Sequence, residues 1–222
     1  MEKAKRYCVF LVGLFISSFG VSLITKADLG TSPIFSVPYV LSLNFPWSLG
    51  QFTVIFSLVL ILLQLLILRR NFTPEHLLQI PISVAFGYFI DLTMQLLSFL
   101  VPQSYPVKLL DLLMGCVVLG FGVYLEVLAD VAMLPGESFV RAVVSTWKTD
   151  FGFTKICFDV SITLIAALGS VIFSGGLEGI REGTVIAALA VGFAARQFGR
   201  LFSFAPELLF GRKEPGCPLQ GN

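Results

Sequence analysis

The order of apolar and polar residues along the chain predicts a helical membrane protein. Six stretches of about 20 mainly apolar residues alternate with short breaks that carry proline, glycine or charge. A helix needs about 20 such residues to cross roughly 30 Å of hydrocarbon, so each stretch predicts one transmembrane helix. The six predicted helices cover approximately residues 7–25, 49–68, 77–101, 108–126, 153–173 and 183–203.

Composition supports this prediction and excludes several classes of protein. Of the 222 residues, 56% are hydrophobic and only 13% are charged, whereas ordinary globular chains carry about 25% charged residues. This excludes a soluble enzyme, a secreted domain and a disordered chain. The net charge of +1 gives no attraction to nucleic acid. We therefore expect an all-α polytopic protein whose main partner is the lipid bilayer, with one transmembrane domain over residues 1–204 and a short cytoplasmic tail over 205–222.

Basic residues near the predicted helix ends give the orientation. One side carries Lys3, Lys5, Arg6, Arg69, Arg70, Arg141, Lys148, Arg212 and Lys213, and the other side only Lys26, Lys108 and Arg181. Short loops rich in Lys and Arg stay in the cytoplasm. The pattern predicts that both termini are cytoplasmic.

Residues that carry catalytic or metal chemistry are scarce. The four cysteines are scattered without a CxxC pair, and His76 is the single histidine. No Ser/His/Asp set, metal-ligand spacing or phosphate-binding loop is present. We therefore expect no enzyme activity, no metal and no cofactor.

The second half of the chain repeats the first at an offset of 102 residues. Eleven identities fall within 44 ungapped positions, and an Ala-Asp-(x)4-Pro element occurs at 27–33 and again at 129–135. After a slip of three residues, Gly87 matches Gly192. Each half, about 7–101 and about 108–203, holds three predicted spans, an odd number, so the two halves enter the membrane from opposite sides. Inverted repeats of this kind are typical of secondary transporters.

Each half also contains an apolar segment too short to cross a bilayer. The first covers 34–44 and follows Ser32 and Pro33, and the second covers 135–147 and begins with Pro135. Proline at the first helical position is a helix-start signal. The segments are either re-entrant, with their positive N-terminal ends facing a central anion site, or amphipathic helices that lie flat in the interface.

Polar residues beside the short segments and charged residues inside the spans are the candidate functional residues. The candidates for solute binding are Lys26, Asp28, Thr31, Ser32, Asp130, Glu137 and Ser138, and those for coupling or a polar pathway are Asp91, Lys155, Asp159 and Arg196. Charged residues at membrane depth are costly, so their default interpretation is functional. Structural alternatives remain open: Asp28 and Asp130 bond backbone N–H groups in turns, Lys155 and Asp159 pair along one helix face, and Arg196 extends to the interface.

Several motifs resemble those of a known family. These are Leu-Gly-Thr-Ser-Pro at 29–33, Pro-Gly at 135–136, the run 152–159 and the glycine-bounded run 179–192. They are similar to the YczE/YyaS/YitT-type bacterial integral membrane proteins, in particular the YczE-like branch. The resemblance implies a multi-pass protein of the bacterial plasma (inner) membrane and leaves the molecular activity open.

The repeat and the charged spans favour a carrier or permease for a small anionic or zwitterionic solute that binds between the repeats. Two alternatives belong to other classes. One is a substrate-capturing subunit that needs an energising partner, and the other is a membrane scaffold or regulator that transports nothing. A homo-oligomer or a partner membrane protein is compatible with each hypothesis.

Overall fold

The structure, a computed structural model, describes residues 2–69 and 74–202. In this part of the chain every regular element is helical. The α-helices are α1 (Glu2–Lys26), α2 (Ser36–Asn44), α3 (Leu49–Leu68), α4 (Gln79–Leu96), α5 (Tyr105–Ala129), α6 (Pro135–Trp147), α7 (Phe151–Ser174) and α8 (Glu182–Leu201), and the short 3-10 turns are η1 (Pro33–Phe35) and η3 (Pro74–Leu78). The predicted tail, 205–222, lies outside the described residues.

Five helices among the described residues are long and apolar enough to cross a membrane. They are α1, α3, α4 with the end of η3, α5 and α7, and they coincide with the first five predicted spans. The sixth predicted span corresponds to α8, a 20-residue helix that is not among the five. Arg196 and Arg200, both in its second half, lower its hydropathy.

Both short segments form helices at the predicted places. A 3-10 turn begins at Pro33, with Ser32 before it, and continues into α2. The second short helix, α6, begins at Pro135. The first residues of both are buried in the protein, including Pro33, Pro135 and Gly136.

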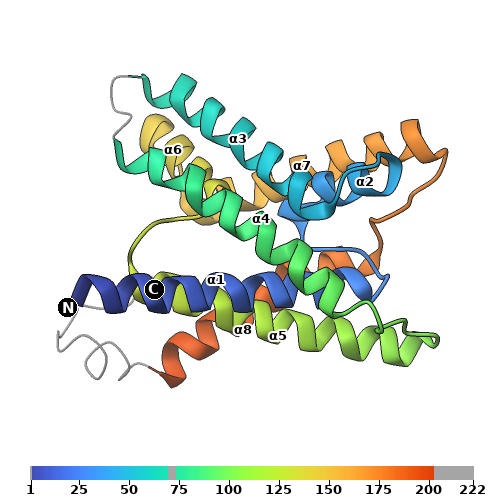
Figure 1. The fold of residues 1–222 in the computed structure, drawn as a ribbon. Coiled ribbons are helices and arrows are strands. Elements are labelled where there is room, and N and C mark those ends of the chain that lie inside the picture. The colour runs from blue at the N-terminus through green and yellow to red at the C-terminus, as the bar shows by residue number, and fades with distance from the viewer. Residues whose placement is uncertain (1, 70–73, 203–222) are drawn as a thin grey trace.

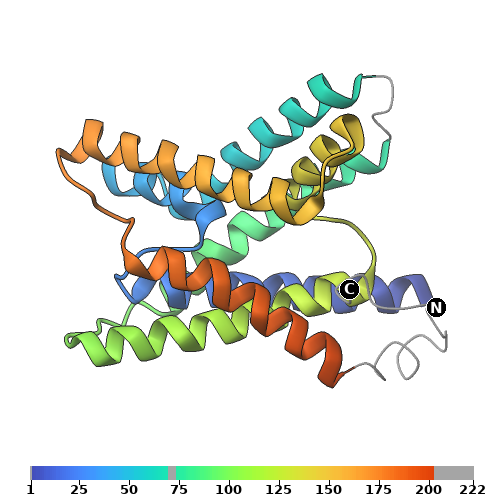
Figure 2. The same ribbon diagram turned by 180° about the vertical axis from the view of Figure 1, so that it is seen from behind.

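The helices form two layers joined by α4. The first layer holds α1, α5 and α8, and the second holds α2, α3, α6 and α7 (Figures 1 and 2). From Pro33 and Pro135 near the middle, α2 and α6 extend toward opposite ends of the bundle (Figure 1). In the second layer α2 packs against α7 and α6 packs against α3. Helix α4 crosses from the first layer to the second and packs against both α1 and α3.

The first layer depends on close packing between the antiparallel helices α1 and α5. A Cβ atom on Gly20 would lie 2.5 Å from the backbone nitrogen of Leu119, and one on Gly122 would lie 2.5 Å from the backbone nitrogen of Ser17. Small residues let helix backbones approach closely in a membrane, where van der Waals packing drives helix association. The glycines of this interface therefore serve helix packing.

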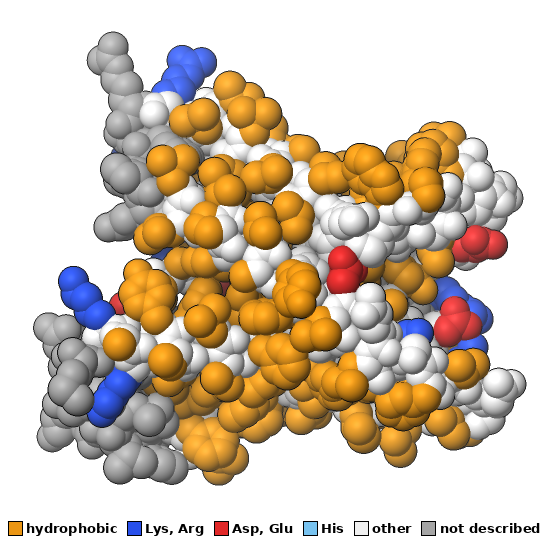
Figure 3. Space-filling view, viewed as in Figure 1, with side chains coloured by type: hydrophobic (Ala, Val, Ile, Leu, Met, Phe, Trp, Pro, Cys, Tyr) orange, Lys and Arg blue, Asp and Glu red, His pale blue; other side chains and the backbone are white. Residues whose placement is uncertain are grey.

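Charge and apolar surface are separated along the bundle. Hydrophobic side chains cover the middle of the face in Figure 3, and basic side chains lie toward its two ends. The cations Lys3, Lys5, Arg6, Arg69 and Lys148 belong to the end where α1 begins and α3 and α6 end, and Lys26, Lys108 and Arg181 belong to the other. An apolar belt between two charged ends fits a lipid bilayer.

The α1–α5 contact gives a stability prediction. We expect Gly20→Val to lower the free energy of unfolding by about 1–3 kcal/mol, because the added methyl groups separate two backbones in contact. Gly169→Ala is the control, since a Cβ there meets its nearest atoms at 3.9 Å. Thermal unfolding in detergent measures both, and equal midpoints would contradict this packing.

Candidate functional site

A cavity of about 440 Å³ lies between the two layers, and we call it the central cavity. Ser17 of α1 and Leu119 of α5, which line it, lie well inside the two longest helices, away from their ends. Helices α3, α4, α7 and α8 supply further walls, with Thr53, Phe86, Lys155 and Arg196 among the lining residues. The volume falls in the range that ligand pockets occupy, about 300–1,000 Å³.

The starts of both short helices meet at the central cavity. Ser32 and Pro33 line it from one side, and Pro135, Gly136 and Glu137 line it from the other. The two starts are so close that a Cβ atom on Gly136 would overlap the Cδ1 atom of Ile34. Helix starts carry backbone N–H groups without intrahelical partners and a positive dipole end. The cavity therefore combines two electropositive helix starts.

Four charged side chains share the central cavity. Lys155 donates to both carboxylate oxygens of Asp159 at 2.5 and 2.7 Å, so the pair predicted from the i, i+4 spacing forms. Glu137, in the first turn of α6, lines the same cavity. Arg196 has no hydrogen bond or ion pair with any residue in the described part of the chain. Two cations and two anions thus line one cavity.

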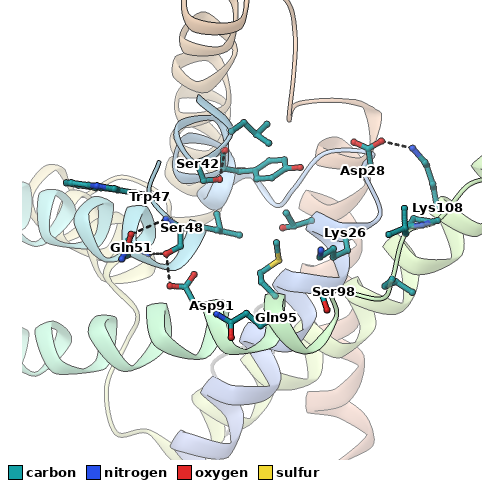
Figure 4. Close-up of a pocket in the computed structure, with 18 of the residues that line it drawn as sticks. Lys26, Asp28, Ser42, Trp47, Ser48, Gln51, Asp91, Gln95, Ser98 and Lys108 are labelled. Atoms are coloured by element: carbon teal, nitrogen blue, oxygen red, sulfur yellow. Dashed lines mark hydrogen bonds and ion pairs between the residues drawn. The ribbon is translucent and has the colours of Figure 1, made fainter. Parts of the chain in front are cut away.

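A second, larger cavity of about 1030 Å³ lies toward the end of the bundle where α1 ends, and we call it the vestibule (Figure 4). Lys26 and Asp28 line it, together with Lys108, whose ammonium group pairs with the Asp28 carboxylate at 2.5 Å. Tyr39 also lines it, and burial followed by the nearby charges of Asp28 and Glu178 raises the pKa of its hydroxyl. The vestibule therefore has a charged outer rim.

Asp91 forms the inner wall of the vestibule. Its carboxylate accepts a hydrogen bond from the Ser48 hydroxyl at 2.6 Å (Figure 4). It also accepts one from the Gly50 backbone N–H at 2.9 Å. Ser48 is itself the N-cap of α3 and accepts from the Gln51 backbone N–H. The aspartate in α4 is thus held at the N-terminus of α3, where negative charge is favourable.

The linings of the two cavities come within one helical turn of each other on α3. Leu49 lines the vestibule and Thr53, one helical turn later, lines the central cavity. Phe35 and Phe86, whose ring centroids lie 5.9 Å apart, cover the central cavity on the same side.

The structure distributes the predicted site residues over more than one place. The vestibule receives Lys26, Asp28 and Asp91, and the central cavity receives Ser32, Glu137, Lys155, Asp159 and Arg196. Thr31 is fully buried, and its backbone N–H donates to the Thr184 hydroxyl. Ser138 bonds Gln64 and Gln79. Asp130 is exposed in a left-handed turn after α5, the conformation that Asp28 adopts after α1.

Two buried polar groups were not among the predicted site residues. Gln64 and Gln79 bond each other and Ser138, and Gln64 also donates to the Pro135 carbonyl at 3.0 Å, so they tie the start of α6 to α3 and α4. Glu126 is 8% exposed and accepts from the Ser17 hydroxyl at 2.5 Å. Gln64 could have been noticed in the sequence, because it is a polar amide within the apolar run 49–68. The described residues contain no cluster of metal ligands.

Composition, fold and charge distribution define a polytopic helical membrane protein. A family model described as a family of unknown function, DUF6198, matches residues 4–200. The chain belongs to this family, and the match covers almost the whole helical bundle.

The chain is also similar to a Bacillus subtilis (strain 168) protein described as the uncharacterized membrane protein YczE. The two are 27% identical over 198 residues, which cover 88% of this chain and 86% of that protein. The resemblance to the YczE-like branch is thereby confirmed. No solved structure matches the chain.

The hydrogen bond between Ser48 and Asp91 predicts an energetic coupling. In a double-mutant cycle of Ser48→Ala and Asp91→Ala we expect a coupling of about 1–2 kcal/mol, because a charge-assisted bond is lost. The matched cycle combines Ser48→Ala with Gln95→Ala, because Gln95 lies one turn after Asp91 on α4 and lines the vestibule but forms no hydrogen bond with Ser48. Thermal unfolding in detergent measures both cycles, and equal coupling energies would refute the assignment.

Proposed function

We propose that this protein carries a small zwitterionic or anionic solute across the bacterial plasma membrane and binds it in the central cavity. The observation that carries the proposal is the presence of Glu137, Lys155, Asp159 and Arg196 in one cavity. Burying charge in lipid is expensive and is retained for pathways and binding sites. Two cations and two anions complement a solute that carries both signs of charge.

The starts of the two short helices support the same proposal. In secondary transporters, half-helices whose N-termini face the midplane bind anionic groups of the substrate. Here Pro33 and Pro135 both line the central cavity, which favours the re-entrant alternative over helices lying flat in the interface. The carboxyls of Glu137 and Asp159 are the candidates for carrying a coupling proton.

Helix pairing supports two inverted repeats. The pairs α1–α4, α2–α3 and α3–α6 each have a counterpart in contact, namely α5–α8, α6–α7 and α7–α2. The matched residues Asp28 and Asp130 both have positive φ, 55° and 48°. These correspondences fit a duplicated unit whose copies have opposite orientations.

The course of α8 supports a sixth span. The Gly183 N–H donates to the Leu29 carbonyl just beyond the end of α1, and the Tyr124 hydroxyl, near the end of α5, donates to the Phe202 carbonyl. Helix α8 therefore runs beside α5 from one end of the bundle to the other (Figure 2). With six spans and the excess of cations where α1 begins, the positive-inside rule places both termini in the cytoplasm.

Water access to the cavity is the first test. With the native cysteines replaced, we expect Ala188→Cys, which lines the central cavity, to react with a charged, membrane-impermeant thiol reagent. The control is Leu189→Cys, because Leu189 is 73% exposed on the outer surface of α8 and does not line the cavity. Lipid excludes the charged reagent from that position. If Ala188→Cys reacts no faster than Leu189→Cys from either side, the cavity is not a solute pathway.

Transport is the second test. Purified protein in liposomes is assayed for uptake of radiolabelled alanine, glutamate, glycine betaine and phosphate, with and without an imposed proton gradient. We expect uptake of at least one probe, and a loss of about tenfold or more in Arg196→Gln, because a charged contact to the solute is removed. The exposed Lys148→Gln, at the end of α6 and outside the cavity, is the control. Absence of uptake for every probe, or equal uptake by both variants, would contradict the proposed site.

A further inference from the structure

One helix pair breaks the correspondence between the two halves. Helices α3 and α4 pack along each other, whereas their counterparts α7 and α8 share almost no contacts. Helices α7 and α8 are joined through residues 175–181, and they lie in different layers of the bundle (Figure 2). The lining of the central cavity includes Gly152 and Lys155 near the start of α7 and Gly192 and Arg196 in the second half of α8.

The glycines that allow the α3–α4 contact are present at the equivalent places in the second half. A Cβ atom on Gly50 would lie 2.1 Å from the Gly87 carbonyl oxygen, so this contact leaves no room for a side chain. Their matches are Gly152 and Gly192. A Cβ on Gly192 meets nothing within 4 Å, and one on Gly152 meets only Asp150, two residues before it in the chain. The second half thus keeps the residues for a close contact that it does not make here.

The polar residues of the α3–α4 contact also have counterparts. Ser48 caps α3, and the matching Asp150 caps α7 by accepting from the Phe153 backbone N–H at 2.8 Å. The partner of Ser48 is Asp91, whose match is Arg196. The pair Ser48 and Asp91 in the first half therefore corresponds to Asp150 and Arg196 in the second half. The first pair can form a hydrogen bond, and the second pair can form an ion pair. Arg196 is exposed and has no partner among the described residues.

We propose that the protein has a second conformation in which α7 packs against α8, with Gly152 beside Gly192 and Arg196 paired with Asp150. In this conformation Asp91 leaves Ser48, and α3 separates from α4. The proposal rests on the proposed carrier function. The exchange between the two helix contacts would control access of the solute to the central cavity. Rocking of one bundle against another around a fixed site is a general property of inverted-repeat carriers.

The two conformations exchange similar interactions. In one state α3 packs against α4, and in the other α7 packs against α8. Each state therefore contains one close glycine contact and one polar side-chain pair. A small free-energy difference between states is what allows a ligand to shift their populations. In the present conformation, residues of both α7 and α8 line the central cavity although the two helices are separated, and α3 packs closely against α4. In the second conformation, the vestibule joins the central cavity, because only one turn of α3, from Leu49 to Thr53, separates their linings.

Pulsed electron paramagnetic resonance in lipid nanodiscs measures both helix pairs without a solute. In a chain without its native cysteines, spin labels at Phe153→Cys and Phe193→Cys report on α7 and α8. Labels at Ile55→Cys and Tyr88→Cys report on α3 and α4. These four side chains are exposed, at 66%, 64%, 40% and 66%, and none lines the central cavity. We expect a long and a short distance for each pair of labels.

Matched substitutions shift the populations in opposite directions. Gly50→Ala, which prevents the α3–α4 contact, should raise the short-distance population of α7 and α8 about fivefold and lengthen the α3–α4 distance. Gly152→Ala should remove the short α7–α8 distance. Asp91→Asn gives the same direction as Gly50→Ala without added volume, so it carries the test if Gly50→Ala does not fold.

The charge pair has its own control. Arg196→Gln and Asp150→Asn should each lower the short-distance population of α7 and α8, and the exchanged pair Asp150→Arg with Arg196→Asp should restore it. A single α7–α8 distance that none of these variants changes would overturn the proposal. Uptake together with an unchanged distance would refute the second conformation and leave the carrier. Distance changes without uptake would retain the conformational change and refute the carrier.

Discussion

The contact between the backbones of α1 and α5 is the constraint on which the rest of the structure depends. Apolar surface gives no preference for one helix partner over another in lipid, because lipid tails are as apolar as leucine. Close packing through Gly20 and Gly122 supplies that preference. Once α1 and α5 are paired, α4 packs against α1, and α8 packs against α5.

The second layer is held together by buried polar contacts on one side and has few contacts on the other. The buried amides Gln64 and Gln79 attach α6 to α3 and α4, whereas α7 is largely exposed, with only 22% of its most apolar window buried. The layer is therefore anchored through α4 on one side and separated from α8 on the other. Three of the four charged residues of the central cavity, Lys155, Asp159 and Arg196, lie on the two separated helices α7 and α8.

Much of the fold could be predicted from the sequence because membrane helices have strong local signals. The length and hydropathy of a segment identify it as a membrane-spanning helix, and Pro33 and Pro135 mark the starts of the short helices. The pairing of Lys155 with Asp159 follows from helical spacing. The division of the predicted site into a vestibule and a central cavity could not be predicted, since it depends on how helices from both halves pack. Likewise, the partner of Asp91 is Ser48, 43 residues earlier, and no local pattern connects them.

The proposed carrier requires two halves that lie in opposite orientations around a water-filled cavity. Trp47 and Thr149 occupy matching positions, each just after a short helix, and both side chains are exposed. Single cysteines at these two positions, labelled with an impermeant reagent in intact cells and in inverted vesicles, measure the orientation directly. With inverted halves, Trp47→Cys reacts only from the external face and Thr149→Cys only from the cytoplasmic face. Labelling of both positions from the same face would contradict it.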